Sequence, residues 1–311
     1  MILTVTLNTA IDKRYTINSL NPKSVMRVNT VENTAGGKGI NVSRVASLGG
    51  EDVIAMGFVG GYTGDLFESL ITQKNIKNSF TKTASDTRYC INVWDESARK
   101  STEFLEPGSS ISESELNNFI EDYKRNIKKA DIITLCGSLP KNVPTNIYAT
   151  LVKIAKENNI PVIVDTSGES LFEASKSKPT MLKPNEDEIK QILQIDEIPD
   201  RQSLINAAIK LYESGIEYSV ISLGKDGMLI ACKDGVYHGI TPDIPVVNTV
   251  GCGDSAVAGF AVGISKKWNI EKTIQYAVAV STANAMNEST GCYTQSDLDY
   301  VMPLIEVKKL K

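Results

Sequence analysis

Asn248-Thr249-Val250-Gly251-Cys252-Gly253-Asp254-Ser255-Ala256-Val257-Ala258-Gly259-Phe260 is the stretch that decides the fold and locates the site. It follows a strand-like run at residues 244–247, and beyond Asp254 it consists of small and apolar residues that pack well in a helix. Between these two parts, Gly251-Cys252-Gly253 predicts a loop with exposed backbone N–H groups. A helix that begins there has free N–H groups and a positive dipole end, so we expect it to bind an anion.

Asp254 stands in the first turn of this predicted helix and has two interpretations. An aspartate is a preferred N-cap residue, because its carboxylate accepts hydrogen bonds from the N–H groups of the first turn. An acid beside an anion site also suits a reaction in which a base takes a proton from a hydroxyl group while a phosphoryl group binds nearby. The short pattern alone favours neither role.

The composition is that of a globular protein without a basic face. The chain has 311 residues, 41% apolar and 23% charged, which is enough for a sizeable core. Its net charge of −4 argues against a nucleic-acid partner. Five scattered cysteines and a single histidine, His238, leave no zinc pattern and fit a reducing compartment. The apolar segment 1–10 predicts a core strand, and no apolar run is long enough to span a membrane, so we expect a cytoplasmic protein.

Strand-like and helix-like segments alternate along most of the chain. Strands are predicted at residues 2–7, 53–59, 131–136, 161–164, 180–182 and 218–223, with helices between them. This alternation predicts a single α/β domain, residues 1–311, with a mainly parallel sheet covered on both faces. Two hairpin regions, about 13–34 and 87–106, carry polar residues on both sides, and we expect them to form a small β-lid over the site.

A second glycine-rich stretch, Ala35-Gly36-Gly37-Lys38-Gly39-Ile40-Asn41-Val42, precedes a predicted helix. Its glycines permit close approach of the backbone to a ligand, although a plain tight turn has the same pattern. It is not a Walker A loop, because Gly39 stands where a Ser or Thr would hold magnesium. Asn41, which faces back from the first helical turn, favours a contact with a polyol.

Several predicted strands end in polar or glycine-rich loops: residues 8–12, 137–138, 183–185, 222–224 and 251–254. In a parallel sheet such loops lie along one edge, where ligands bind. Asp12 is either a ligand for a sugar hydroxyl or a turn aspartate. Asn185 and Glu188 stand at i and i+3 of a predicted helix start. Glu188 would bind Mg²⁺ through water, or the acids there interact favourably with the helix dipole.

The two glycine-rich stretches resemble the two signatures of the ribokinase-like, or PfkB, family of carbohydrate kinases. Residues 35–42 are similar to the first signature, and Val250-Gly251-Cys252-Gly253-Asp254-Ser255 to the second. Lys183-Pro184-Asn185, the Asn-x-x-Glu element 185–188 and Ser222-Leu223-Gly224 stand between them in the family's order, so the resemblance covers essentially the whole chain. It implies a ribokinase-like three-layer α/β fold with a β-lid, and transfer of a phosphoryl group from ATP with Mg²⁺ to a sugar hydroxyl.

The resemblance also implies a role for each matching residue. Asp254 would be the base, and the anion hole would consist of the N–H groups of Gly251, Cys252 and Gly253. The sugar would be held by Asp12, Gly37 and Asn41. The nucleotide would be held by Lys183, Asn185, Ser222, Gly224 and Asn284, and the metal by Glu188. One departure is Asn248, where many members have Asp, which weakens any role of this position in holding a monovalent cation.

Four stretches are similar to the hexose-phosphate branch of the family: residues 4–12, 87–88, 137–140 and 248–251. This branch needs cationic groups for the phosphate already on the sugar. The candidates are Arg27, Lys38 and Arg88, with the hydroxyl group of Ser138. We therefore expect a ketohexose phosphate as the acceptor, first tagatose 6-phosphate, with fructose 1-phosphate or fructose 6-phosphate as alternatives.

A catalytically silent sugar-phosphate sensor on the same fold is the main alternative to a kinase. The presence of Asp254 argues against it, because a binding protein has no need of a base. An NAD-dependent enzyme is excluded because residues 36–39 lack the Rossmann spacing. The predicted lid strands have exposed edges, which commonly pair with a partner, so we expect a homodimer through the lid.

Overall fold

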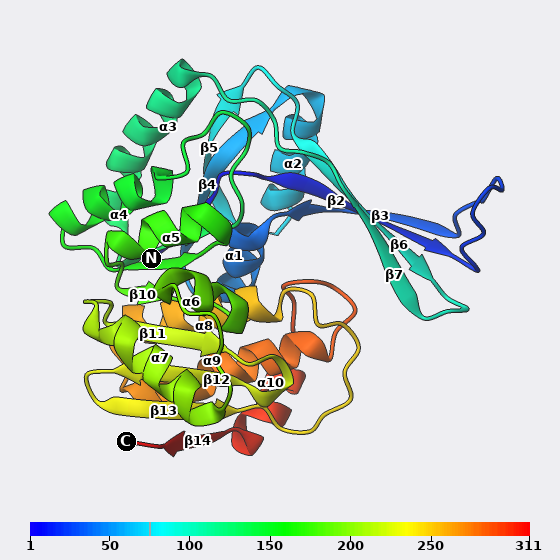
Figure 1. Ribbon diagram of the computed structural model, residues 1–311. Coiled ribbons are helices and arrows are strands. Elements are labelled where there is room, and N and C mark those ends of the chain that lie inside the picture. Colours follow the sequence, from blue (N-terminus) through cyan, green and yellow to red (C-terminus); the bar gives the residue numbers. More distant parts are fainter. Residues whose placement is uncertain (75) are drawn as a thin grey trace.

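The computed structural model describes residues 1–74 and 76–311 and contains a large sheet between two layers of helices (Figure 1). The ten strands of this sheet are β1 (Ile2–Thr6), β4 (Val53–Gly60), β5 (Lys77–Thr83), β8 (Ile132–Cys136), β9 (Val162–Asp165), β10 (Met181–Leu182), β11 (Tyr218–Ser222), β12 (Met228–Cys232), β13 (Gly235–Ile240) and β14 (Glu306–Lys309). Their order in space is β14-β13-β12-β11-β10-β9-β8-β1-β4-β5.

The sheet is mainly parallel, as the alternation of strands and helices predicts. All neighbouring pairs from β5 to β11 run parallel, and β12, β13 and β14 add antiparallel strands at one edge. β1 lies between β4 and β8, and all of its residues are buried. A strand that is covered by helices on both faces is largely apolar, which explains Ile2, Leu3 and Val5. The buried hydroxyl group of Thr4 forms a hydrogen bond with that of Ser43 at 2.6 Å.

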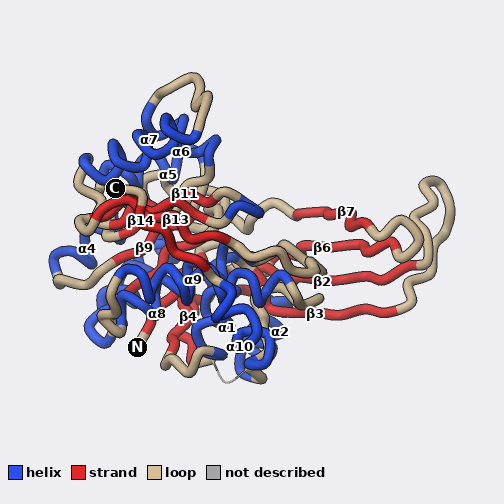
Figure 2. Tube along the Cα trace, turned by 90° about the horizontal axis from the view of Figure 1, so that it is seen from below, coloured by secondary structure: helices blue, strands red, loops and turns tan. Residues whose placement is uncertain are grey.

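Helices cover both faces of the large sheet (Figure 2). One face shares its core with α1 (Lys38–Leu48), α2 (Gly61–Thr72), α8 (Cys252–Ser265), α9 (Ile270–Ala285) and α10 (Gln295–Val301). The other face shares its core with α3 (Glu113–Asn126), α4 (Ile147–Glu157), α5 (Gly168–Lys176), α6 (Glu186–Leu193) and α7 (Arg201–Glu213). Short 3-10 helices span Ile127–Lys129, Gly224–Asp226 and Met302–Leu304. In the described part of the chain, no helix has both the length and the apolar character needed to cross a bilayer.

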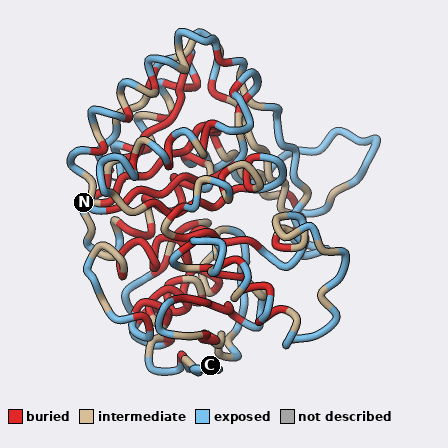
Figure 3. The backbone as a smooth tube through the Cα atoms, turned by 60° about the vertical axis from the view of Figure 1, so that its left-hand side comes forward, coloured by how far each residue is buried: buried red, intermediate tan, exposed pale blue. Residues whose placement is uncertain are grey.

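Four further strands form a separate sheet, called the small sheet below, which projects from the body (Figures 1 and 2). They are β2 (Ala10–Ile17), β3 (Thr30–Gly36), β6 (Arg88–Asp95) and β7 (Lys100–Leu105), in the order β3-β2-β6-β7. β2 pairs antiparallel with β3 and parallel with β6. Buried residues concentrate in the body, and the small sheet is mostly half-buried or exposed (Figure 3). Its strands come from the two hairpin regions that the sequence indicates.

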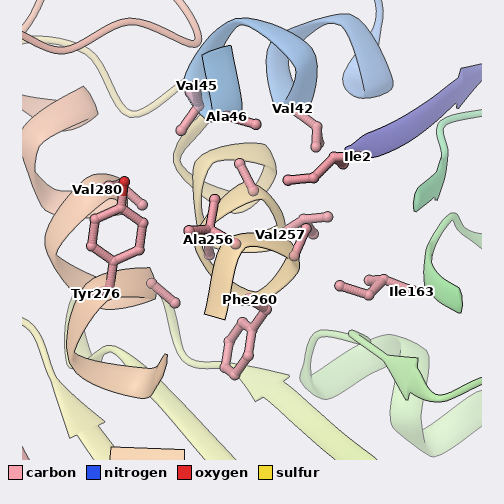
Figure 4. Packing of buried hydrophobic residues seen from close by; sticks show 14 of the residues in the cluster. Ile2, Val42, Val45, Ala46, Ile163, Ala256, Val257, Phe260, Tyr276 and Val280 are labelled. Atoms are coloured by element: carbon pink, nitrogen blue, oxygen red, sulfur yellow. The ribbon is translucent and has the colours of Figure 1, made fainter. Parts of the chain in front are cut away.

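α8 is buried on nearly all sides, which explains its small residues. It packs against α1 and α9, and Ala256, Val257 and Phe260 lie in the shared core (Figure 4). A Cβ atom at Gly259 would lie 2.4 Å from Cα of Ala277, so only glycine allows the two helices to approach this closely. A helix that is apolar all round belongs in a core. The predicted helix after the glycine-rich loop is therefore present and central.

Residues 244–247 do not form the strand that the sequence predicts. Pro242 and Pro245 have no N–H group for a strand ladder. The N–H groups of Val247 and Asn248 donate instead to the carbonyl oxygen of Ala285, at 2.8 and 3.1 Å. Residues 241–250 are therefore a loop that the end of α9 holds in place, and Val247 is 53% exposed.

Candidate active site

The start of α8 presents backbone N–H groups. Gly251 is the N-cap residue and has φ of +83°, a region that favours glycine. Among residues 1–74 and 76–311, the N–H groups of Gly251 and Gly253 have no hydrogen-bond acceptor. The N–H group of Cys252 donates to the carbonyl oxygen of Thr249 at 3.3 Å. Two of the three N–H groups expected in the anion hole are thus free, at the positive end of the helix dipole.

Asp254 lies in the first turn of α8, three residues beyond Gly251, so the N-cap interpretation of this aspartate is wrong. Its side chain is buried, and the residue is only 6% exposed. One carboxylate oxygen, Oδ2, accepts a hydrogen bond of 2.7 Å from Nδ2 of Asn41 in α1. The two glycine-rich stretches therefore meet at this carboxylate.

The environment of Asp254 makes it a better base than an exposed aspartate. Burial raises the pKa of its carboxyl group to about 6, and the nearby carboxylate of Asp165 adds to this increase. Lys38, the hydrogen bond from Asn41 and Lys183 act in the opposite direction. A base with a pKa just below neutrality is ionised at pH 7 and still accepts a proton readily.

Asp12 is a second buried carboxylate, and it belongs to β2 of the small sheet and not to a turn. Burial raises its pKa to about 6, although the cations of Arg44 and Arg88 lower it. The negative charge of Asp254 contributes to the increase, so the two carboxylates lie close enough to interact. A Cβ atom at Gly36 would lie 2.2 Å from the carboxyl carbon of Asp12, so this glycine leaves the space for the side chain.

Three charged side chains meet at the carboxyl end of β9. The side chain of Asp165 is 2% exposed and forms ion pairs with Lys38 and Lys183, both at 3.3 Å. Burial alone would lower the pKa of Lys38, but the charges of Asp165 and Asp254, together with the hydrogen bond to Asp165, outweigh burial and raise this pKa. A Cβ atom at Gly253 would lie 3.6 Å from Nζ of Lys183, so this ammonium group lies against the start of α8.

Asn284 holds the loop before α8 in place through hydrogen bonds. It is completely buried in α9, and its Nδ2 donates to the carbonyl oxygen of Val250 at 3.0 Å and to Sγ of Cys252 at 3.4 Å. Its Oδ1 accepts from the N–H group of Cys292 at 3.1 Å. The sequence assigns this residue to the nucleotide side, whereas its polar atoms are engaged with the backbone and one thiol of neighbouring loops.

Arg88, at the start of β6, joins the small sheet to a loop of the body. Its Nη1 donates to the carbonyl oxygen of Glu106 at 2.8 Å and its Nη2 to that of Asn8 at 3.4 Å, while its buried Nε has no partner among the described residues. Nδ2 of Asn8 donates to Oγ of Ser138 at 3.1 Å. Arg88 also lines a cavity of about 400 Å³, together with Lys141 and other residues. Arg88 and Ser138, both expected at the substrate phosphate, thus share Asn8 as a neighbour.

Asn185 and Glu188 form a capping box at the start of α6. Oδ1 of Asn185 accepts from the N–H groups of Asp187 and Glu188, at 2.9 and 2.8 Å. In return, Oε2 of Glu188 accepts from the N–H group of Asn185 at 2.8 Å. This arrangement satisfies the helix start, as the helix-dipole interpretation of these residues expects.

The same helix start retains donor atoms for a metal. Oε1 of Glu188 has no hydrogen bond to any described residue, and Mg²⁺ usually combines one or two carboxylates with waters and phosphate oxygens. The described residues contain no cluster of three or more His, Cys, Asp or Glu residues that would enclose an ion. The residues fit a water-mediated Mg²⁺ and not an ion held by protein alone. Ser222 pairs with Asn185 through the backbone, and a Cβ atom at Gly224 would meet open space.

Of the remaining predicted sugar ligands, Gly37 lies at the site and Arg27 lies far from it. Gly37 caps α1 with φ of +112°, and a Cβ atom there would lie 2.6 Å from Cγ2 of Thr6, so the turn requires glycine. Arg27 is exposed on the connection between β2 and β3, at the outer end of the small sheet (Figure 1). A single chain therefore does not bring Arg27 to Asp254.

Sequence reasoning missed three members of this cluster, namely Asp165, Arg44 and Asn8. Arg44 donates from Nη2 to Oδ1 of Asn41 at 2.5 Å and from Nη1 to the carbonyl oxygen of Thr290 at 3.0 Å. Each residue had a sequence signal. Asn8 and Asp165 directly follow predicted strands, where ligands of parallel sheets bind, and Arg44 lies three residues after Asn41 on the same helix face.

Residues 5–296 match the model of the pfkB family carbohydrate kinases. The chain belongs to this family. It is therefore a phosphotransferase that uses a hydroxyl group as the acceptor. The kinase is 40% identical over 309 residues to the tagatose-6-phosphate kinase of Staphylococcus epidermidis, and the match covers 99% of each chain.

Solved structures agree with this assignment of the fold. Phosphofructokinase-2 from Escherichia coli in complex with potassium has a TM-score of 0.91 and 25% identity, over 97% of the kinase and 98% of that chain. The tetrameric inhibited form of the same enzyme has a TM-score of 0.91 and 26% identity, with the same coverage. The kinase thus has the ribokinase-like fold that the two signatures imply.

Proposed function

We propose that this kinase transfers the γ-phosphoryl group of ATP to a hydroxyl group of a ketohexose phosphate, with tagatose 6-phosphate as the main candidate. The observation that carries the proposal is the buried carboxylate of Asp254 beside the free N–H groups of Gly251 and Gly253. A base next to an anion site suits deprotonation of an alcohol while a phosphoryl group is held. The identity to the tagatose-6-phosphate kinase of S. epidermidis supports this acceptor.

In this mechanism Asp254 accepts the proton of the attacking hydroxyl group, while the hydrogen bond from Asn41 holds its carboxylate in position. The N–H groups of Gly251 and Gly253, and the dipole of α8, stabilise the charge on the transferring phosphoryl group, and Cys252 lies between them in the same turn. Asp12 and the backbone at Gly37 orient the sugar.

The phosphate already present on the sugar is assigned to Arg88, Lys38 and Ser138. Arg27 would reach this phosphate from the small sheet of a second chain. An arginine binds a phosphate through two parallel hydrogen bonds, which gives both strength and orientation. The buried Nε of Arg88, which has no partner among the described residues, supports a further ligand on this guanidinium group.

The ATP phosphates are assigned to Lys183 and Asn185, and the nucleotide also to Ser222 and Gly224, which lie next to the start of α6. Glu188 would hold Mg²⁺ through water, and the ion supplies positive charge that neutralises the phosphate oxygens during transfer. Asn284 contributes indirectly to nucleotide binding, because its hydrogen bonds fix the loop that leads to α8.

We further infer one domain in which the small sheet acts as a lid, and a homodimer through that sheet. Tyr15, Val31, Val93, Ile91 and Phe104 share the face opposite Asp12, because strand residues alternate and paired residues share a face. Val31 and Phe104 are 50% and 58% exposed, and a second copy would cover them. A dimer would also offer Arg27 of one chain to the partner's site. Sedimentation of a monomer at assay concentration would contradict this inference.

A panel of acceptors tests the proposed function. Turnover of ATP is measured with tagatose 6-phosphate, fructose 6-phosphate, fructose 1-phosphate and unphosphorylated tagatose, and kcat/KM ranks them. We expect tagatose 6-phosphate to rank first. Fructose 6-phosphate is the second candidate because of the likeness to phosphofructokinase-2. Clear binding of a sugar phosphate without any turnover would instead indicate a sensor.

A further inference from the structure

Asp165 is a buried acid that neither signature contains. It ends β9, its side chain is 2% exposed, and it pairs with Lys38 and Lys183 at 3.3 Å each. The two lysines are 145 residues apart in the chain and come from the start of α1 and from the loop after β10. A carboxylate that is removed from water is costly unless it is paired, so this three-membered group is stable only as a unit.

We propose that Asp165 is a positioning residue that holds Lys38 and Lys183 as a fixed pair of cations beside Asp254, and that this pairing is required for the phosphoryl-transfer step. The inference rests on the proposed function, since it assumes that the reaction takes place at Asp254. Asp165 itself touches no substrate in this scheme, and it acts through the two lysines.

The two lysines approach the Asp165 carboxylate from different loops of the site. A Cβ atom at Gly253 would lie 3.6 Å from Nζ of Lys183, which puts this lysine against the anion hole at the start of α8. A Cβ atom at Gly137 would lie 3.7 Å from Cβ of Lys38, which puts the second lysine beside the loop that carries Ser138. Lys183 thus lies next to the proposed anion hole, and the base of the Lys38 side chain lies next to the loop that carries Ser138.

The pairing also reduces the freedom of long side chains. An unpaired lysine samples many rotamers, and ordering it costs on the order of 1–2 kcal/mol. A single buried carboxylate that forms ion pairs with both ammonium groups fixes them before the substrates bind. Preorganised charges that need not move during the reaction are an effective source of transition-state stabilisation.

The titratable groups that interact electrostatically with the Asp254 carboxylate come from several elements. They are Lys38 and Arg44 of α1, Asp12 of β2, Cys136 of β8, Asp165 of β9, Lys183 after β10 and Cys252 of α8 itself. Among the charges on Asp254, the Asp165 carboxylate raises its pKa, whereas Lys38 and Lys183 lower it. The loss of Asp165 should therefore lower the pKa of Asp254 and also that of Lys38, which Asp165 raises.

The decisive experiment is the pH dependence of kcat/KM for Asp165→Asn against the wild-type kinase. We expect kcat to fall at least tenfold, and the acidic limb of the profile to move to lower pH by about one unit. The sugar phosphate titrates in the same range for both proteins, so only the difference between the two profiles is interpreted. Asp52→Asn is the matched control, because Asp52 forms an exposed ion pair with Lys77 at 2.9 Å, and its profile should not move.

A second variant keeps the test sharp if Asp165→Asn does not fold. Lys38→Met removes a cation that lowers the pKa of Asp254, so its acidic limb should move to higher pH, opposite to the shift for Asp165→Asn. The side chain of Lys38 is 45% exposed, which makes this change tolerable for the fold.

A readout without substrate separates this inference from the proposed function. Lysine side chains labelled with ¹³C are titrated by NMR in the wild-type kinase and in Asp165→Asn. The Lys38 resonance should titrate at lower pH in the variant by about one unit or more. Unchanged lysine titration, or reduced kcat with the acidic limb in its wild-type position, would overturn the positioning role. If the Lys38 resonance titrates at lower pH in Asp165→Asn, but the wild-type kinase turns over none of the acceptors, the pairing stands and only the proposed function is refuted.

Discussion

Nδ2 of Asn41 donates a hydrogen bond of 2.7 Å to Oδ2 of Asp254, and this bond joins the first turns of α1 and α8. The two residues are 213 positions apart in the chain. The same amide receives a hydrogen bond at Oδ1 from Arg44, so its orientation is fixed. Asn41 therefore determines which oxygen of Asp254 remains available to a substrate, and it stabilises the ionised form of the base.

Asn41→Ala should weaken catalysis through the base. A hydrogen bond to a carboxylate contributes about 1.5–3 kcal/mol, so its loss should raise the acidic limb of the pH–rate profile by about one unit or more. We expect kcat to fall about tenfold at pH 7 because a smaller fraction of Asp254 is ionised and because it is less well oriented. An acidic limb at the wild-type position would contradict this role, and Asn158→Ala, a change at the exposed end of α4, is the control.

Asp254→Asn removes the proposed base while it keeps the size of the side chain. General-base catalysis typically contributes about 10²–10⁴-fold, so kcat should fall by at least two orders of magnitude. KM for ATP and for the sugar phosphate should change little, because the change affects the chemical step. Steady-state kinetics with the best acceptor measures both quantities. A large increase of KM with normal kcat would show that Asp254 binds substrate and does not act as a base.

The same variant should be more stable than the wild-type kinase at high pH. The folded pKa of about 6 lies above the usual aspartate value of 3.8, so protonation favours the folded state and wild-type stability rises as the pH falls through 6. Above that pH the buried charge costs about 2–3 kcal/mol, and asparagine avoids this cost. Urea unfolding at pH 8 should therefore show Asp254→Asn to be more stable, with a smaller difference at pH 4.5. Equal stabilities at pH 8 would contradict the raised pKa.

Much of this site could be predicted because strand ends and glycine patterns are local signals. The parallel direction of the strands follows from alternating strands and helices, and it brings the loops at residues 8–12, 183–185 and 251–254 to one edge. The conformations of Gly37 and Gly251, with positive φ, explain why glycine stands at these turns. Local patterns of this kind carry information on their own.

Other features depend on three-dimensional neighbours and were missed for that reason. An aspartate after a strand, such as Asp165, has the same sequence pattern as any turn acid until two lysines from distant segments are placed beside it. The β-branched residues near Val247 suggest a strand, but no strand within residues 1–74 and 76–311 pairs with them. Asn284 has a helical position that gives no hint of its hydrogen bonds to the loop before α8.

Arg88→Ala should affect the phosphorylated substrate selectively. We expect KM for the sugar phosphate to rise tenfold or more, since a charge-assisted hydrogen bond contributes about 1.5–3 kcal/mol, while KM for ATP stays within a factor of about two. Arg88→Lys should recover part of the loss, because it keeps the charge but not the fork geometry. Unphosphorylated tagatose is the substrate control and should be indifferent to the change. Equal effects on ATP and sugar phosphate would indicate a structural arginine that only holds Glu106 and Asn8.

Two glycine substitutions at the start of α8 should separate folding from catalysis. Gly251→Ala places a methyl group 2.9 Å from the backbone nitrogen of Gly291 at φ of +83°, and we expect it to destabilise the fold by about 1–3 kcal/mol. Gly253→Ala has no such strain, since its nearest neighbour is Nζ of Lys183 at 3.6 Å, and a helical alanine stabilises by about 0.5–1 kcal/mol relative to glycine. Its methyl group would nevertheless lie beside Nζ of Lys183, in the space proposed for the phosphoryl group.

Thermal unfolding and kcat are measured on both variants. We expect an unstable protein for Gly251→Ala and a stable but poorly active one for Gly253→Ala. Full activity of Gly253→Ala would contradict close packing of the phosphoryl group between Lys183 and this turn.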